Sequence, residues 1–198
     1  MSEQFWWYVT RASGMVAAVL IAFTLIWGLA LSTKIVNRRG LPAWLTDLHR
    51  GLAALSVVFV GIHMFALWAD SYEQFGLAEL FVPFASTWKP TPVAWGVFAV
   101  WMLAVVQGTS LLQRKMPKKA WHRIHLLSFP IGVLVGIHAM TAGTDSGNLW
   151  FRIVTLVLAC GVLFLTIFRV ITRNDKVTTS RIPEMPSGSA SGGAAGLR

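Results

Sequence analysis

Two stretches of the chain decide its fold: LHRGLAALSVVFVGIHMFALWAD at 48–70 and IHLLSFPIGVLVGIHAMTAGTD at 124–145. Each is apolar over about 20 residues, the length that an α-helix needs to cross the hydrocarbon core of a bilayer. Each also has one histidine near its start and a second histidine in the string VGIH. The repeat therefore predicts two membrane helices with histidines at matched depths. An ionisable side chain inside an apolar span usually marks a functional site, so these histidines are the first candidates for one.

The whole chain has the composition of an integral membrane protein. Of its 198 residues, 55% are hydrophobic and 13% are charged, which is far from the balance of a soluble domain. The sequence predicts an all-α bundle of five transmembrane helices, at 14–33, 47–69, 92–113, 123–142 and 149–171. An external amino-terminal segment at 1–13 precedes this domain of 14–171, and a Ser- and Gly-rich, disordered cytoplasmic tail at 172–198 follows it.

The net charge of +9 reflects membrane topology and not binding to nucleic acid, because the basic residues lie in short connections between apolar segments. They flank the first and third connections and follow the last span: Lys34, Arg38, Arg39, Arg50, Arg114, Lys115, Lys118, Lys119, Arg123, Arg169, Arg173, Lys176 and Arg181. Positively charged connections face the cytoplasm. We therefore predict a multi-pass protein of the cell membrane, in contact with lipid, with its amino terminus outside.

The first span has a second reading as a cleaved signal peptide, because GLALS at 28–32 offers small residues at a cleavage site. A signal peptide has its positive charge before the apolar run, whereas here only Arg11 precedes the run and the basic cluster follows it. A retained helix is therefore favoured.

Cys160 is the only cysteine, which excludes an internal disulfide and a thiolate metal site.

The four repeated histidines lie at two depths. His49 and His63 are 14 residues apart and His125 and His138 are 13 apart, which corresponds to rises of about 21 Å and about 20 Å. The two helices run parallel because one span separates them, so His49 can face His125 and His63 can face His138. A heme iron that is held by two imidazoles needs one nitrogen on each side of the porphyrin plane, and each pair of facing histidines can supply this. The two pairs can therefore hold two hemes. A bare zinc or copper ion would instead gather its ligands at one level.

Helical phase agrees with this pairing in one helix only. Fourteen residues return to within about 40° of the starting face, but thirteen fall about 140° away. Pro130 lies between His125 and His138 and can bend the helix or shift its register. His122, one helical turn before His125, does no better on phase and remains the alternative inner ligand. Gly61 and Gly136, each two residues before a histidine, are small enough for a flat ring to approach.

The histidine pairs, together with WHRIH at 121–125 after a basic connection, resemble the ferric reductase-like transmembrane domain family. This family includes ferric reductases, NADPH oxidases and the heme subunit of bacterial methionine sulfoxide reductase, and the resemblance covers 11–171. It implies two b-type hemes stacked across the bilayer, the inner one held by His49 and His125 and the outer one by His63 and His138. Electrons would pass from the cytoplasm to an external acceptor. Arg11, in YVTRASG at 8–14, is a candidate partner for a heme propionate or a lipid headgroup.

The sequence departs from the larger members of that family after the last span. Those members have a cytoplasmic flavin and nicotinamide domain there, whereas only the short segment 172–198 follows the last span here. SGSASGGAAG at 187–196 is glycine-rich but lacks the strand–turn–helix context of a phosphate-binding loop. We therefore expect a ferric reductase-like oxidoreductase, or an electron-transfer subunit, that receives electrons from a separate flavoprotein or a quinol.

Two other functions fit the sequence. The chain can be a heme-binding membrane anchor of one dedicated external reductase. It can also be a transporter or sensor in which the histidines handle protons or metal ions without heme.

Overall fold

The computed structural model describes residues 4–32, 43–70 and 75–179, with side chains described as far as 171. These residues form helices α1 (Gln4–Ser32), α2 (Ala43–Ala69), α3 (Leu77–Phe81), α4 (Pro90–Leu111), α5 (Lys118–His125), α6 (Ser128–Thr141) and α7 (Leu149–Thr179). Two 3₁₀ turns, η1 (Gln113–Lys115) and η2 (Thr144–Gly147), lie in the connections. The described ranges contain no strand, so the prediction of an all-α protein is confirmed.

Five helical segments are long and apolar enough to cross a membrane, one of them made of α5 and α6 together. This agrees with the five predicted spans and differs at their ends. The first helix begins at Gln4 and so includes most of the segment placed before the span. The last helix continues to Thr179, well into the predicted tail, because the sequence has no proline or glycine between Gly161 and Pro183 to end it. Residues 180–198 lie outside the described residues.

The fourth span is interrupted, as the position of Pro130 predicts. Helix α5 ends at His125 and α6 begins at Ser128. Pro130 has no N–H and its ring clashes with the carbonyl four residues earlier, that of Leu126, so a regular helix cannot pass this point. Instead, the N–H of Leu127 donates to the carbonyl of Ile124 at 2.9 Å, three residues back. Such 3₁₀ bonds turn the chain by about 120° per residue instead of about 100°, which rotates His138 toward the face that His125 occupies.

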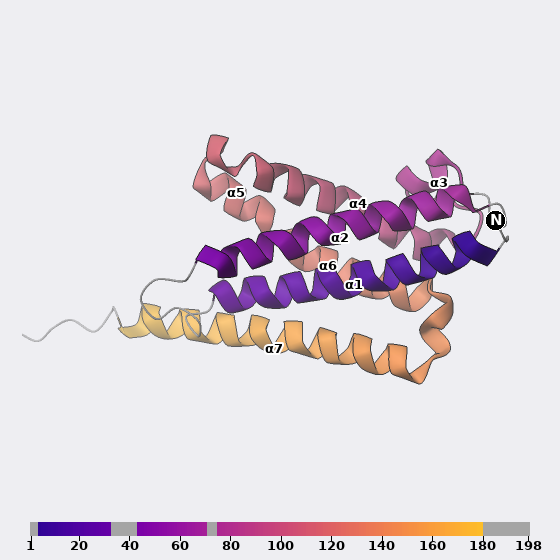
Figure 1. Cartoon of the computed structure of the whole chain (residues 1–198). Helices are drawn as coiled ribbons and strands as arrows, with labels where there is room; N and C mark the ends of the chain where they lie inside the picture. The colour runs from indigo at the N-terminus through magenta and orange to yellow at the C-terminus, as the bar shows by residue number, and fades with distance from the viewer. Residues whose placement is uncertain (1–3, 33–42, 71–74, 180–198) are drawn as a thin grey trace, which may run out of the picture.

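Helix α1 holds the bundle together, because it packs against α2, α6 and α7, while α4 packs against α5 and α6 (Figure 1). The central contact is an apolar cluster of Ile21, Leu25, Val106 and Ile131. Within the described helices, α2 and α6 scarcely touch each other. The two histidine-bearing segments therefore face each other across a space instead of packing directly.

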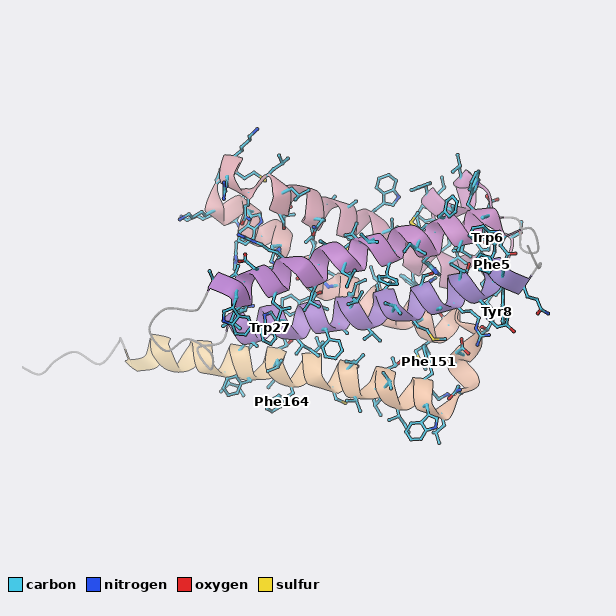
Figure 2. The ribbon with its side chains drawn as sticks, viewed as in Figure 1. Phe5, Trp6, Tyr8, Trp27, Phe151 and Phe164 are labelled. Carbon is cyan, nitrogen blue, oxygen red and sulfur yellow. The ribbon has the colours of Figure 1, made fainter. Side chains whose placement is uncertain are left out.

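The described helices run in alternate directions through the bundle, so their ends gather at its two ends (Figure 1). The end of α1, the start of α2, helix α5 and the end of α7 lie at one end, and the start of α1, helix α3 and η2 lie at the other (Figure 1). Aromatic side chains occur near both ends, with Phe5, Trp6 and Tyr8 at one and Trp27 toward the other (Figure 2). The indole of Trp27 donates to the carbonyl of Leu45 at 2.9 Å and ties α1 to α2. Aromatic rings at these levels are typical of the two membrane–water interfaces.

The predicted orientation can be checked with two single cysteines in a Cys160→Ser background. Thr87 and Lys118 are both exposed. Thr87 lies between α3 and α4, and Lys118 begins α5 at the opposite end of the bundle (Figure 1). A membrane-impermeant maleimide added to intact cells should label Thr87→Cys, whereas Lys118→Cys should react only after the membrane is permeabilised. Labelling in the reverse pattern would show that the end of the bundle with α5 is external.

Candidate functional site

The structure brings together both of the predicted histidine pairs. His49 and His63, on α2, face His125 at the end of α5 and His138 on α6. The ring centres are 6.2 Å apart in the His49–His125 pair and 6.4 Å apart in the His63–His138 pair. We call the first pair the inner pair, because it lies toward the basic end of the bundle, and the second the outer pair.

Both separations suit an ion shared by two imidazoles. A metal–nitrogen bond of about 2.0 Å, with about 1.1 Å from a ring centre to its nitrogen, puts two rings on opposite sides of an ion about 6.2 Å apart. The ring planes are crossed at 67° in the inner pair and at 81° in the outer pair.

Hydrogen bonds fix the protonation of the outer pair. Nδ1 of His63 lies 2.9 Å from the carbonyl oxygen of Thr10, and Nδ1 of His138 lies 2.9 Å from the carbonyl oxygen of Pro92. A carbonyl only accepts a hydrogen bond, so Nδ1 carries the proton in both rings. The unprotonated Nε2 of each ring, which points away from its carbonyl, is then free to bind a metal.

A cavity of about 260 Å³ adjoins the outer pair. Its walls are mostly apolar and come from several helices, with Met15, Ala18, Leu67, Val97, Leu103 and Val135 among them. Arg11, Asp70, Glu79 and Asp145 are the charged residues that line it. An apolar space with a few polar groups is the usual environment of a bound organic cofactor.

The inner pair has a different environment. Nδ1 of His49 and Nδ1 of His125 are buried and have no hydrogen-bond partner among the residues that the structure describes. The backbone of Thr24 lies close to the His49 ring, but this contact does not meet hydrogen-bond geometry. Trp121 stacks on His125, with ring centres 5.0 Å apart and planes at 25°. Its indole N–H is also buried without a partner in the described part of the chain. Unsatisfied buried groups of this kind are typical of a site that binds a ligand.

His122, the alternative inner ligand, is exposed at the surface of α5. The ring that faces His49 is that of His125. Arg11 pairs with Asp145, and its Nε donates to Oδ2 at 2.9 Å, while the guanidinium lies 4.2 Å from the centre of the Trp7 ring. The sequence did not predict this ion pair, and it competes with any propionate for Arg11.

Gly61 and Gly136 have no neighbour within 4 Å of an added Cβ in the described part of the chain, so their role beside a flat ring stays a prediction.

Sequence reasoning missed the glycines that contact the histidines. The rings of His49, His63 and His138 lie directly against Gly28, Gly14 and Gly96 on neighbouring helices. One signal was available: Gly14 and Gly28 have the same separation along the chain as His49 and His63. Two antiparallel helices in contact match such equal spacings residue for residue.

The donor groups favour a cofactor over a bare ion. No group of three or more His, Cys, Asp or Glu side chains within 4–32, 43–70 and 75–171 is placed to hold a metal ion. Two histidines at each level are too few to complete the coordination of an ion, so another group would have to supply the remaining ligands. No protein-family profile, curated protein or solved structure matches this chain.

Proposed function

We propose that the chain binds two b-type hemes, one in each histidine pair, and carries electrons across the membrane from a cytoplasmic donor to an external acceptor. The observation that carries this proposal is the recurrence of one geometry at two levels. Ring centres 6.2 Å and 6.4 Å apart, in pairs about 21 Å apart along α2, are what two stacked bis-histidine hemes require. The mostly apolar cavity beside the outer pair and the unprotonated Nε2 atoms of His63 and His138 support the same conclusion.

The residues of the chain have distinct tasks in this proposal. Heme, when bound, supplies an iron that changes its oxidation state by one electron. If heme is bound, the two imidazoles at each level would leave its iron no open coordination position, and this ligand set favours electron relay over chemistry on a bound substrate. The apolar walls around Val97 and Val135 give the outer site a largely non-polar environment. The donor is oxidised at the inner end and the acceptor is reduced at the outer end, with no group transferred.

The inner end offers a surface for the electron donor. The exposed basic residues on and before α5 are Arg114, Lys115, Lys118, Lys119 and Arg123. His122 is exposed on the same helix. Such a cluster attracts anionic headgroups and also acidic partners. We propose that a separate flavoprotein, or a quinol in the membrane, delivers electrons here.

The test is the heme content of the purified protein. After expression with sufficient heme, a pyridine hemochrome assay should give two b-type hemes per chain, and the oxidised protein should show low-spin ferric EPR signals. Because the ring planes are crossed at 67° and 81°, these signals should be strongly anisotropic. The His49→Ala/His63→Ala double variant, which removes one ligand from each pair, should contain no heme. Wild-type protein without Soret absorption would refute the proposal and favour a histidine-based transporter or sensor.

A further inference from the structure

Three of the four paired histidines lie against a glycine of a neighbouring helix. A Cβ added at Gly14 would come within 2.9 Å of His63 Nδ1, and one added at Gly96 within 2.8 Å of His138 Nδ1. A Cβ added at Gly28 would lie 3.0 Å from His49 Cε1. These distances are shorter than ordinary contacts between carbon and nitrogen or carbon, so alanine at any of the three positions would displace the ring.

The spacing of these glycines explains the hydrogen bonds of the outer pair. In an α-helix the carbonyl of residue i accepts from the N–H of residue i+4, and the side chain at i+4 lies beside that carbonyl. Gly14 is four residues after Thr10, and Gly96 is four residues after Pro92. Without a Cβ at these positions, the second lone pair of each carbonyl stays open to an imidazole N–H. His63 and His138 each make this bond at 2.9 Å.

The inner pair lacks such bonds even where the same spacing recurs. Gly28 is four residues after Thr24, yet Nδ1 of His49 makes no hydrogen bond with any described residue. His125 stacks on Trp121 and lies against no glycine of those described. The two levels therefore share their ligand type and differ in the groups that contact the ligands.

A hydrogen bond from Nδ1 to a carbonyl changes what Nε2 does to a metal. It shifts electron density toward Nε2, raises the basicity of the ligand and fixes the plane of the ring. A more basic ligand stabilises the more positive oxidation state of iron, and this lowers its reduction potential. Among the described residues, both histidines of the outer pair make such a bond and neither histidine of the inner pair does.

We propose that Gly14 and Gly96 are positioning residues that open the helix carbonyls of Thr10 and Pro92 to the outer histidines, and that they thereby set the ring planes and lower the potential of the outer heme. This inference rests on the proposed function. It makes the outer site a stronger reductant toward the external acceptor than the same two histidines would be without these bonds. The difference between the levels lies in the hydrogen bonds that the carbonyls of Thr10 and Pro92 accept, and not in the glycine spacing alone, because Thr24 and Gly28 have the same spacing at the inner level.

The test compares Gly14→Ala and Gly96→Ala with Gly51→Ala, an exposed α2 position where an added Cβ meets nothing within 4 Å in the described part of the chain. In a spectroelectrochemical titration, the outer component is identified by its loss from a His63→Ala variant. It should shift to a more positive potential in both test variants, and the outer EPR signal should change with the ring plane. The inner component, and both components of Gly51→Ala, should keep their wild-type values.

Each outcome distinguishes the possibilities. Retention of the outer heme with an unchanged potential and EPR signal would overturn the proposal, as would an equal shift of both components. Loss of the outer heme alone, with the inner heme retained, would support it, because the defect is then confined to the histidines that lie against these glycines. Loss of both hemes from both variants would overturn the local role. Wild-type protein that contains no heme would refute the proposed function itself.

Discussion

Alanine at His63 or at His138 is expected to remove the outer heme and to stop electron transfer to an external acceptor, while one heme stays reducible from the cytoplasmic side. Each of these rings supplies one side of the outer pair, across 6.4 Å. Met64 and Met140 are close in sequence but do not replace them, because side chains one and two residues after a histidine on a helix point about 100° and about 160° away from it. Heme content should fall from two to one per chain, and reduction of an external ferric chelate by proteoliposomes should fall to background.

Met64→Leu is the matched control for this experiment. Met64 lines the same cavity as His63 and packs against the apolar cluster of Phe75, Leu80 and Val93. A change of similar volume at this wall should leave two hemes and nearly wild-type transfer. If His63→Ala or His138→Ala still bound two hemes per chain, the pairing of these two residues would be wrong.

The features that the sequence predicted depend on properties carried along a single helix. Hydropathy defines a membrane span, and the constant rise of an α-helix turns the separation of His49 and His63 along the chain into a depth. Two parallel helices with nearly the same separation then match at two levels without knowledge of how they pack. The five spans and the facing of His63 and His138 follow from these regularities.

The features that the sequence did not predict depend on contacts between helices. Arg11 and Asp145 are far apart along the chain, and nothing local in either segment indicates their ion pair. The carbonyls of Thr10 and Pro92 are backbone atoms, which every residue has, so the types of these two residues do not indicate the hydrogen bonds. The glycines four residues later, Gly14 and Gly96, are the sequence feature that goes with them. Glycines are common in membrane helices because they allow helices to pack closely, so a glycine alone does not indicate contact with a histidine. The structure identifies that contact by placing the histidine ring against the glycine.

The interruption of the fourth span shows how local and tertiary effects combine. Pro130 predicts that a straight helix fails, but not where the chain turns or by how much. The 3₁₀ bonds at Leu127 and Phe129 compensate for part of the phase error between His125 and His138. This interruption puts His125 at the last position of α5, facing α2, and leaves His122 one turn earlier on the exposed side.

His125→Ala is therefore expected to lose the inner heme, whereas His122→Ala should keep both. His125 faces His49 across 6.2 Å and stacks on Trp121, and without it His49 has no imidazole opposite at this level among the described residues. His122 lies among Lys118, Lys119 and Arg123 on the exposed surface of α5, where it is available to the electron donor. We expect His122→Ala to show slower reduction by the donor with full heme content. Heme stoichiometry in the two variants separates the roles: loss of a heme in His122→Ala with retention in His125→Ala would move the inner ligand by one helical turn.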